Sequence, residues 1–216
     1  MSTHDTAVVF VHGLWLNGVE STFLRRRLAG DLDCDTCAFR YPSVSASMPD
    51  IVQRLAAFVA QLEVRTLHFI GHSLGGIVLL RYFDQSPVLP PGRIVLLGSP
   101  VRGSRAARRV ARWPLGAAVM GRNIEAEVLQ SRERRWEHPR DLGVVAGDLS
   151  LGLGRLFGDL GGANDGTSSV DETELPGATD RIVLRVSHTG MLFSPQVAHQ
   201  AAAFLARGQF EARPSA

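Results

Sequence analysis

Lysine is absent from this chain of 216 residues, so all 23 of its basic residues are arginines. Without lysine, neither a Schiff base nor a lysine nucleophile is available to its chemistry. The formal net charge of +2 at pH 7 is small, and nucleic acid is therefore not expected as a partner. No apolar run approaches the roughly 18 residues that a membrane span requires, so integral membrane association is not expected either.

Cysteine is also scarce, since Cys34 and Cys37 are the only two, and their spacing is C-x-x-C. Redox motifs share this spacing, but here the pair straddles the start of a predicted strand rather than a helix. A zinc site with four ligands would need further Cys or His residues close by. We interpret both residues as ordinary thiols, whose pairing the sequence leaves open, and we expect no metal and no cofactor.

The amino terminus lacks the marks of a secretory signal peptide. No basic segment, long apolar segment or small-residue cleavage site precedes the apolar run at 7–11. The sequence therefore predicts a cytoplasmic location. With 45% hydrophobic and 20% charged residues the composition is that of an ordinary globular protein, and the length predicts a single domain over 1–216.

Short apolar runs alternate with amphipathic helical patterns along the chain. This order is typical of an α/β protein whose mostly parallel sheet is covered by helices on both faces. The predicted strands are 7–11, 36–39, 67–70, 94–97, 142–145 and 182–186. The predicted helices lie near 21–30, 50–63, 75–84, 104–112, 123–131 and 195–206. Two stretches depart from this alternation: 99–140, which predicts a small cap or lid, and a glycine-rich loop at 148–168.

The segment 71–75 reads Gly-His-Ser-Leu-Gly and matches the pattern G-x-S-x-G between a predicted strand and a predicted helix. This strand-turn-helix context is what a nucleophile elbow requires. Gly71 and Gly75 omit a Cβ where the two backbones crowd, and the helix directs its first N–H groups toward the site. The pattern predicts that Ser73 is a nucleophile, although a serine can also simply cap a helix.

GHSLGG at 71–76 and FVHGLW at 10–15 together resemble the bacterial lipase and esterase branch of the α/β-hydrolase superfamily. The resemblance extends from residue 7 to about residue 206, and it is strongest in four short segments. It implies an α/β-hydrolase fold in its minimal form, a three-layer sandwich with about six strands. It also implies a serine hydrolase that cleaves carboxylic esters through an acyl-enzyme intermediate.

Acyl transfer passes through a tetrahedral oxyanion, which two N–H donors stabilise. The residue after the nucleophile, Leu74, is expected to supply one donor through its backbone. The loop after the first strand is expected to supply the other, and the resemblance points to the N–H of Leu14. His12 precedes this loop without an acidic partner nearby, so we interpret it as a loop organiser rather than as a base.

A serine nucleophile needs a histidine base that a carboxylate orients, and in this fold the order is Ser, Asp or Glu, then His. His188 ends the run at 182–187, where a loop can place its imidazole over Ser73. Asp165 is the predicted acid, because the family's acid often lies in an Asp-Gly pair. The same residues also favour a plain turn. Asp148, which directly follows the fifth strand, is the alternative acid.

Apolar side chains flank these segments, and four of them are predicted to line a substrate pocket: Trp15, Met191, Leu192 and Phe193. We expect a small-molecule or lipid-like ester with a short to medium acyl chain. Four arginines of one helical face either contact anionic lipid or are simply solvated, and we favour the second: Arg105, Arg108, Arg109 and Arg112. A thioesterase, amidase or lactonase would use the same triad, and a binding module without catalysis remains the non-enzyme alternative.

Overall fold

The computed structural model describes residues 4–113, 121, 134–151 and 160–211. Within these residues, one all-parallel sheet has the strand order β2-β1-β3-β4-β5-β6. Its strands are β1 (Thr6–Val11), β2 (Asp35–Phe39), β3 (Thr66–His72), β4 (Ile94–Leu97), β5 (Leu142–Gly147) and β6 (Asp180–Leu184). The six predicted strands and the α/β class are confirmed. Every pairing is parallel, whereas the sequence predicted a mostly parallel sheet.

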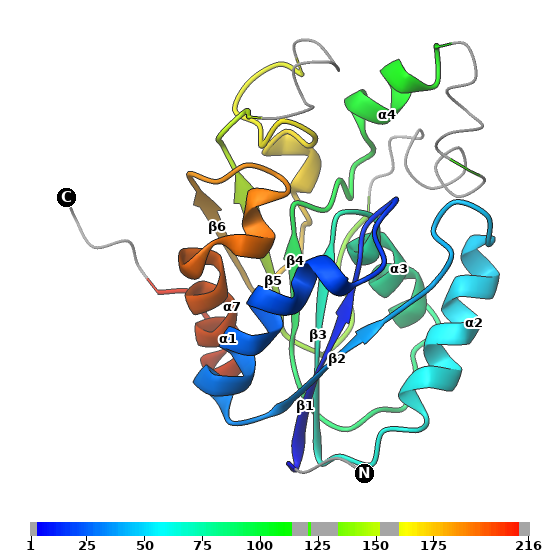
Figure 1. Cartoon of the computed structure of the whole chain (residues 1–216), viewed down its shortest axis with the longest axis vertical. Helices are drawn as coiled ribbons and strands as arrows, with labels where there is room; N and C mark the ends of the chain where they lie inside the picture. Colours follow the sequence, from blue (N-terminus) through cyan, green and yellow to red (C-terminus); the bar gives the residue numbers. More distant parts are fainter. Residues whose placement is uncertain (1–3, 114–120, 122–133, 152–159, 212–216) are drawn as a thin grey trace.

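Helices cover both faces of this sheet (Figure 1). Those described are α1 (Thr22–Leu32), α2 (Met48–Val59), α3 (Leu74–Phe83), α4 (Arg105–Val110) and α7 (Pro195–Arg207). Short 3₁₀ helices that the sequence did not predict are η1 (Val19–Ser21), η3 (Asp171–Thr173) and η4 (Gly190–Phe193). The helix predicted at 123–131, and with it much of the predicted cap, lies outside the described residues.

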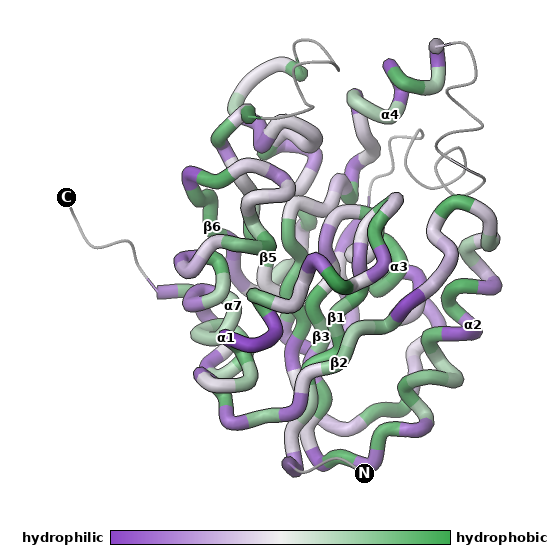
Figure 2. The backbone as a smooth tube through the Cα atoms, viewed as in Figure 1, coloured by the Kyte–Doolittle hydropathy of each residue, from purple (hydrophilic) through white to green (hydrophobic). Residues whose placement is uncertain are grey.

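Helix α2 begins directly after a capping serine and has one apolar face. The Ser47 hydroxyl accepts a hydrogen bond from the N–H of Asp50 (3.3 Å) and so caps the helix, while Pro49 occupies the first turn. Ile51 and Leu55 lie on the face that is buried against the sheet. The alternation of hydrophobic and hydrophilic colour along α2 in Figure 2 shows this amphipathic pattern.

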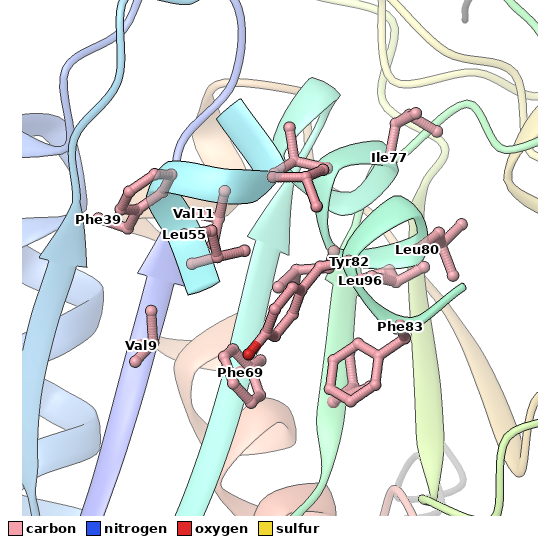
Figure 3. Close-up of a cluster of buried hydrophobic side chains, with 14 of the residues drawn as sticks. Val9, Val11, Phe39, Leu55, Phe69, Ile77, Leu80, Tyr82, Phe83 and Leu96 are labelled. Atoms are coloured by element: carbon pink, nitrogen blue, oxygen red, sulfur yellow. The ribbon is translucent and has the colours of Figure 1, made fainter. Parts of the chain in front are cut away.

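The core consists of two layers that the sheet separates. Val9 and Val11 of β1 pack into the layer beneath α2 and α3, whereas Val8 and Phe10 pack into the layer beneath α1 and α7. Side chains alternate in this way because successive residues of a strand point to opposite faces. Figure 3 shows the first layer, where the ring of Phe69 lies beside Tyr82 and Phe83 of α3.

The topology creates a natural position for a site. The chain leaves β1 toward β2 on one side and returns to β3 on the other, so the loops after β1 and β3 diverge. In open α/β sheets, ligands bind in the crevice that forms at such a point, outside the carboxyl ends of the strands. This edge of the sheet faces upward in Figure 1. Ser73 directly follows β3, Asp165 lies in the connection between β5 and β6, and His188 lies shortly after β6.

Candidate active site

Ser73 lies on a strained turn between β3 and α3. Its backbone has φ 54° and ψ −121°, a conformation that side-chain-bearing residues rarely adopt. The turn is held because the N–H of Ser73 donates to the carbonyl oxygen of Leu97, at 2.9 Å. A Cβ added at Gly75 would lie 2.0 Å from the carbonyl oxygen of Val11. Glycine is therefore required there, since α3 and the end of β1 approach too closely for any side chain.

The strain at Ser73 leads to a stability prediction. We expect Ser73→Gly to be more stable than Ser73→Ala by about 1 kcal/mol, because glycine adopts a positive φ without the steric cost that alanine retains. Both variants lack the hydroxyl, so they differ only by the Cβ methyl group of alanine, which is the source of the steric cost. Urea denaturation of the pair measures the difference, and an alanine variant as stable as the glycine variant would show that the turn is unstrained.

Asp165 and His188 form a close pair. The carboxylate Oδ2 of Asp165 lies 2.7 Å from Nδ1 of His188, and the N–H of His188 donates to the carbonyl oxygen of Asp165, at 2.9 Å. Their side chains are 1% and 12% exposed, so water competes little with this contact. A carboxylate only accepts, and Nδ1 therefore carries the proton. The lone pair of Nε2 is left to act as a base.

The loop around Asp165 fixes the direction of its carboxylate. Oδ1 accepts hydrogen bonds from the N–H groups of Thr167 (2.8 Å) and Ser168 (2.7 Å), which is an Asx turn. The turn that the sequence allowed and the contact with His188 are thus both present. Asp148, the alternative acid, is exposed at the end of β5, and in the described part of the chain its carboxylate makes no hydrogen bond to His188.

Gly98, which the sequence analysis did not single out, makes room for this pair. A Cβ on Gly98 would lie 2.9 Å from Oδ2 of Asp165 and 3.1 Å from Nδ1 of His188. Its φ of 57° also favours glycine, and its carbonyl accepts a hydrogen bond from the Ser168 hydroxyl (3.1 Å). The only signal available in the sequence was a glycine directly after a buried strand.

His188 and Ser73 lie at the same edge of the sheet. The imidazole of His188 is 4.8 Å from the ring of His72, the residue before Ser73. No hydrogen bond joins the Ser73 hydroxyl to His188 in the part of the chain that the structure describes. Catalytic hydrogen bonds often tighten only when a substrate is bound, so this geometry suits a nucleophile and base before reaction.

The loop after β1 lies directly against Ser73. A Cβ on Gly13 would lie 3.0 Å from Cβ of Ser73. Among the described residues, nothing accepts a hydrogen bond from the N–H of Leu14. Leu74 begins α3, where the first N–H groups have no partner within the helix. The two predicted oxyanion donors therefore lie on segments that border Ser73, and neither is committed to another element.

His12 organises this loop from a fully buried position. Its Nδ1–H donates to the carbonyl oxygen of Gly13 (2.8 Å), its Nε2 accepts from the N–H of Tyr41 (3.3 Å), and the two rings stack at 4.2 Å. Burial lowers the pKa of His12, which keeps the ring neutral. In a trans peptide the C=O and N–H point in opposite directions, so anchoring the Gly13 carbonyl also directs the N–H of Leu14.

The four residues predicted to line a substrate pocket divide into two groups. Trp15, in the loop after β1, and Phe193, the last residue of η4, are each 53% exposed. Met191 and Leu192 have no exposed surface and belong to the core layer beneath α1 and α7. The structure gives these two a packing role, because η4 turns both side chains inward against α7.

The arginine series does not form one uniform cationic face. α4 ends at Val110, which is earlier than predicted. The guanidinium of Arg105 donates to the carbonyl oxygen of Leu160 (2.9 Å) and to the hydroxyl of Ser169 (3.3 Å), so it fastens α4 to the loop before η3. A side chain used in this way is not free to contact an anionic surface.

The two cysteines are free thiols of low reactivity. Cys34 and Cys37 are not joined by a disulfide, and burial raises the pKa of each thiol to about 11, which leaves both protonated at neutral pH. Across the described residues, no group of three or more His, Cys, Asp or Glu side chains is arranged to hold a metal ion.

A membrane-spanning helix must be both long and apolar. None of the described helices is both long and apolar enough to span a membrane.

A doubly wound parallel sheet with a strained serine between strand and helix defines the class of α/β hydrolases. The chain belongs to the alpha/beta hydrolase family, whose model matches residues 8–215. No curated protein sequence is significantly similar to it.

Solved structures of similar fold include several hydrolases. The mature form of Bacillus licheniformis lipase BlEst2 has a TM-score of 0.71 and 21% identity, over 93% of this chain and 90% of that one. The RedJ thioesterase from the prodiginine pathway of Streptomyces coelicolor has a TM-score of 0.61 and 12% identity, over 94% and 90%. A pyrethroid hydrolase from Sphingobium faniae has a TM-score of 0.59 and 12% identity, over 94% and 98%. At these identities the likeness establishes the fold.

Proposed function

We propose that this protein is a serine hydrolase that cleaves carboxylic esters through an acyl-enzyme intermediate. Ser73 is the nucleophile, His188 the base and Asp165 the carboxylate that orients the base. The observation that carries the proposal is the pair formed by Asp165 and His188, with 2.7 Å between Oδ2 and Nδ1, at the edge where the strained turn presents Ser73. Membership of the hydrolase family supports the same chemistry.

Acylation begins when the hydroxyl oxygen of Ser73 attacks the ester carbonyl carbon and its proton passes to Nε2 of His188. The carbonyl oxygen becomes an oxyanion, which the N–H groups of Leu14 and Leu74 stabilise by roughly 3 kcal/mol per donor. Asp165 stays ionised and stabilises the imidazolium. The intermediate then collapses as Nε2 returns the proton to the departing alkoxide, and the alcohol leaves.

Deacylation repeats these steps with water in place of the serine. His188 takes a proton from the water as it attacks the acyl carbon, and the same two N–H groups hold the second oxyanion. Nε2 then protonates the oxygen of Ser73, which releases the carboxylic acid and restores the free enzyme. No step requires a metal or a cofactor.

The proposed substrate is an ester with a short to medium acyl chain. Trp15 follows the loop segment that borders Ser73 and Phe193 ends η4, shortly after His188; both expose large apolar side chains, which suits an uncharged acyl or alcohol group. α4 lies beyond the carboxyl edge of the sheet (Figure 1), where a small cap would stand. Thioesters, amides and lactones would react by the same steps. The rates of hydrolysis of these compounds, compared with those of esters, therefore identify the preferred leaving group.

Hydrolysis of p-nitrophenyl esters tests the proposal directly. We expect turnover to be fastest between the acetate and the octanoate and to decline toward the palmitate, together with covalent labelling by a fluorophosphonate probe. A preference confined to long emulsified esters would refute the chain-length proposal. Failure to label and to turn over any ester would refute the hydrolase proposal itself.

A further inference from the structure

His72 is a buried polar residue that the proposed mechanism does not use. It ends β3, directly before the nucleophile, and its side chain is fully enclosed. Its ring is tilted by 46° against the ring of His188, with 4.8 Å between the centroids. No signal in the sequence pointed to His72, because the pattern G-x-S-x-G leaves this position unspecified.

In the described ranges of the chain, only one of the two ring nitrogens of His72 has a hydrogen-bond partner. Nε2 lies 3.1 Å from the carbonyl oxygen of His188, and since a carbonyl only accepts, Nε2 carries the proton. Nδ1 is then an acceptor, and among the described residues it is the buried side-chain polar atom without a hydrogen-bond partner. It faces Gly13, where a Cβ would come within 3.3 Å.

The unpaired Nδ1 lowers the stability of the fold, so the presence of His72 here indicates that its single hydrogen bond contributes to function. Leaving a buried acceptor unpaired is unfavourable, and an apolar side chain of similar size would avoid the cost. Burial, together with the neighbouring His188, lowers the pKa of His72 to about 3, so the ring stays neutral and keeps its Nε2 proton at ordinary pH. Nε2–H of His72 therefore remains a hydrogen-bond donor to the backbone carbonyl of His188 at ordinary pH.

His188 is held at three points, and His72 supplies one of them. Asp165 provides two, by accepting from the ring Nδ1–H and from the backbone N–H of His188. These two bonds come from the loop after β5, on the acid side. The third comes from β3, the strand that carries Ser73, and it connects the base directly to the nucleophile's own turn.

We propose that His72 is a positioning residue, whose Nε2–H bond to the His188 carbonyl sets the base at the correct distance from Ser73. The proposal rests on the proposed function, because it concerns the same triad. His72 touches no reacting atom. Its effect is on the placement of His188, and a displacement of about 1 Å at a catalytic group reduces rate on the order of 10²-fold.

A matched pair of amides separates this role from simple packing. The amide nitrogen of glutamine reaches the position of Nε2, whereas that of asparagine reaches only the position of Nδ1. We expect His72→Asn to lose roughly 10²-fold in kcat and in the rate of fluorophosphonate labelling, with KM little changed, and His72→Gln to stay within about threefold of wild type. His72→Leu, which removes both nitrogens, replaces the asparagine variant if that variant does not fold.

His68→Asn is the control, since His68 is a second buried histidine of β3. Its Nδ1 accepts from the N–H of Arg93 (3.0 Å), away from the site, so its asparagine variant should keep the wild-type rate. Wild-type activity in His72→Asn, or an equal loss in His72→Gln, would overturn the proposal.

Amide hydrogen exchange provides a readout that does not depend on activity. The N–H of His188 and that of Met191, which donates to Ser187, should exchange faster in His72→Asn and at the wild-type rate in His72→Gln. If the wild type hydrolyses nothing, the proposed function fails, but exchange still decides whether His72 holds His188. Unchanged exchange in both variants would overturn the positioning role.

Discussion

Replacing Ser73 with alanine is expected to reduce kcat for ester hydrolysis by a factor on the order of 10⁶ and to abolish fluorophosphonate labelling. The loss is this large because in the proposed mechanism the hydroxyl forms the acyl-enzyme and the three residues act as a unit. The residual rate would come from the oxyanion donors and from substrate binding. Steady-state kinetics and mass spectrometry of the labelled protein measure both effects.

Ser86→Ala is the matched control for this prediction. Ser86 also has a positive φ, 48°, but it is exposed and follows the far end of α3 from the elbow. Its alanine variant should keep wild-type kinetics and labelling. Labelling that persists in Ser73→Ala would show that another residue is the nucleophile, and the proposed mechanism would then be wrong.

Asp165→Asn is expected to lower kcat by about 10⁴-fold while changing KM little. Asparagine fits the same space and keeps Oδ1, which accepts from Thr167 and Ser168, so the loop should retain its shape. Its amide nitrogen, however, donates to Nδ1 of His188 in place of Oδ2. The proton of the imidazole then moves to Nε2, and the base loses the lone pair that takes the proton of Ser73.

Asp148→Asn tests whether Asp165 is the correct acid. Asp148 is exposed at the end of β5, and its substitution should leave kcat unchanged. If Asp165→Asn retained near-normal activity while Asp148→Asn lost it, the orienting role would pass to Asp148. A pH profile of the two variants adds an independent check, because only the variant with the wrong tautomer should lose its activity at every pH.

The sequence by itself determined the features that depend on neighbouring residues. The strand, the turn at Ser73 and the helix could be predicted together, since apolar periodicity and closely spaced glycines act over a few residues. The six strands were found for the same reason. His12 was interpreted as a loop organiser because it precedes the loop without an acidic partner nearby, and in the structure its ring bonds to the carbonyl oxygen of Gly13.

Only the tertiary structure decided how residues distant in the sequence meet. Asp165 and His188 come together because β5 and β6 are neighbours in the sheet, whereas the sequence favoured Asp165 only through the family's Asp-Gly pair and left Asp148 as the alternative. The burial of Met191 likewise depends on how η4 packs against α7. The bond from His72 to His188 joins the end of β3 to the segment after β6, between residues 116 positions apart, so no local pattern could predict it.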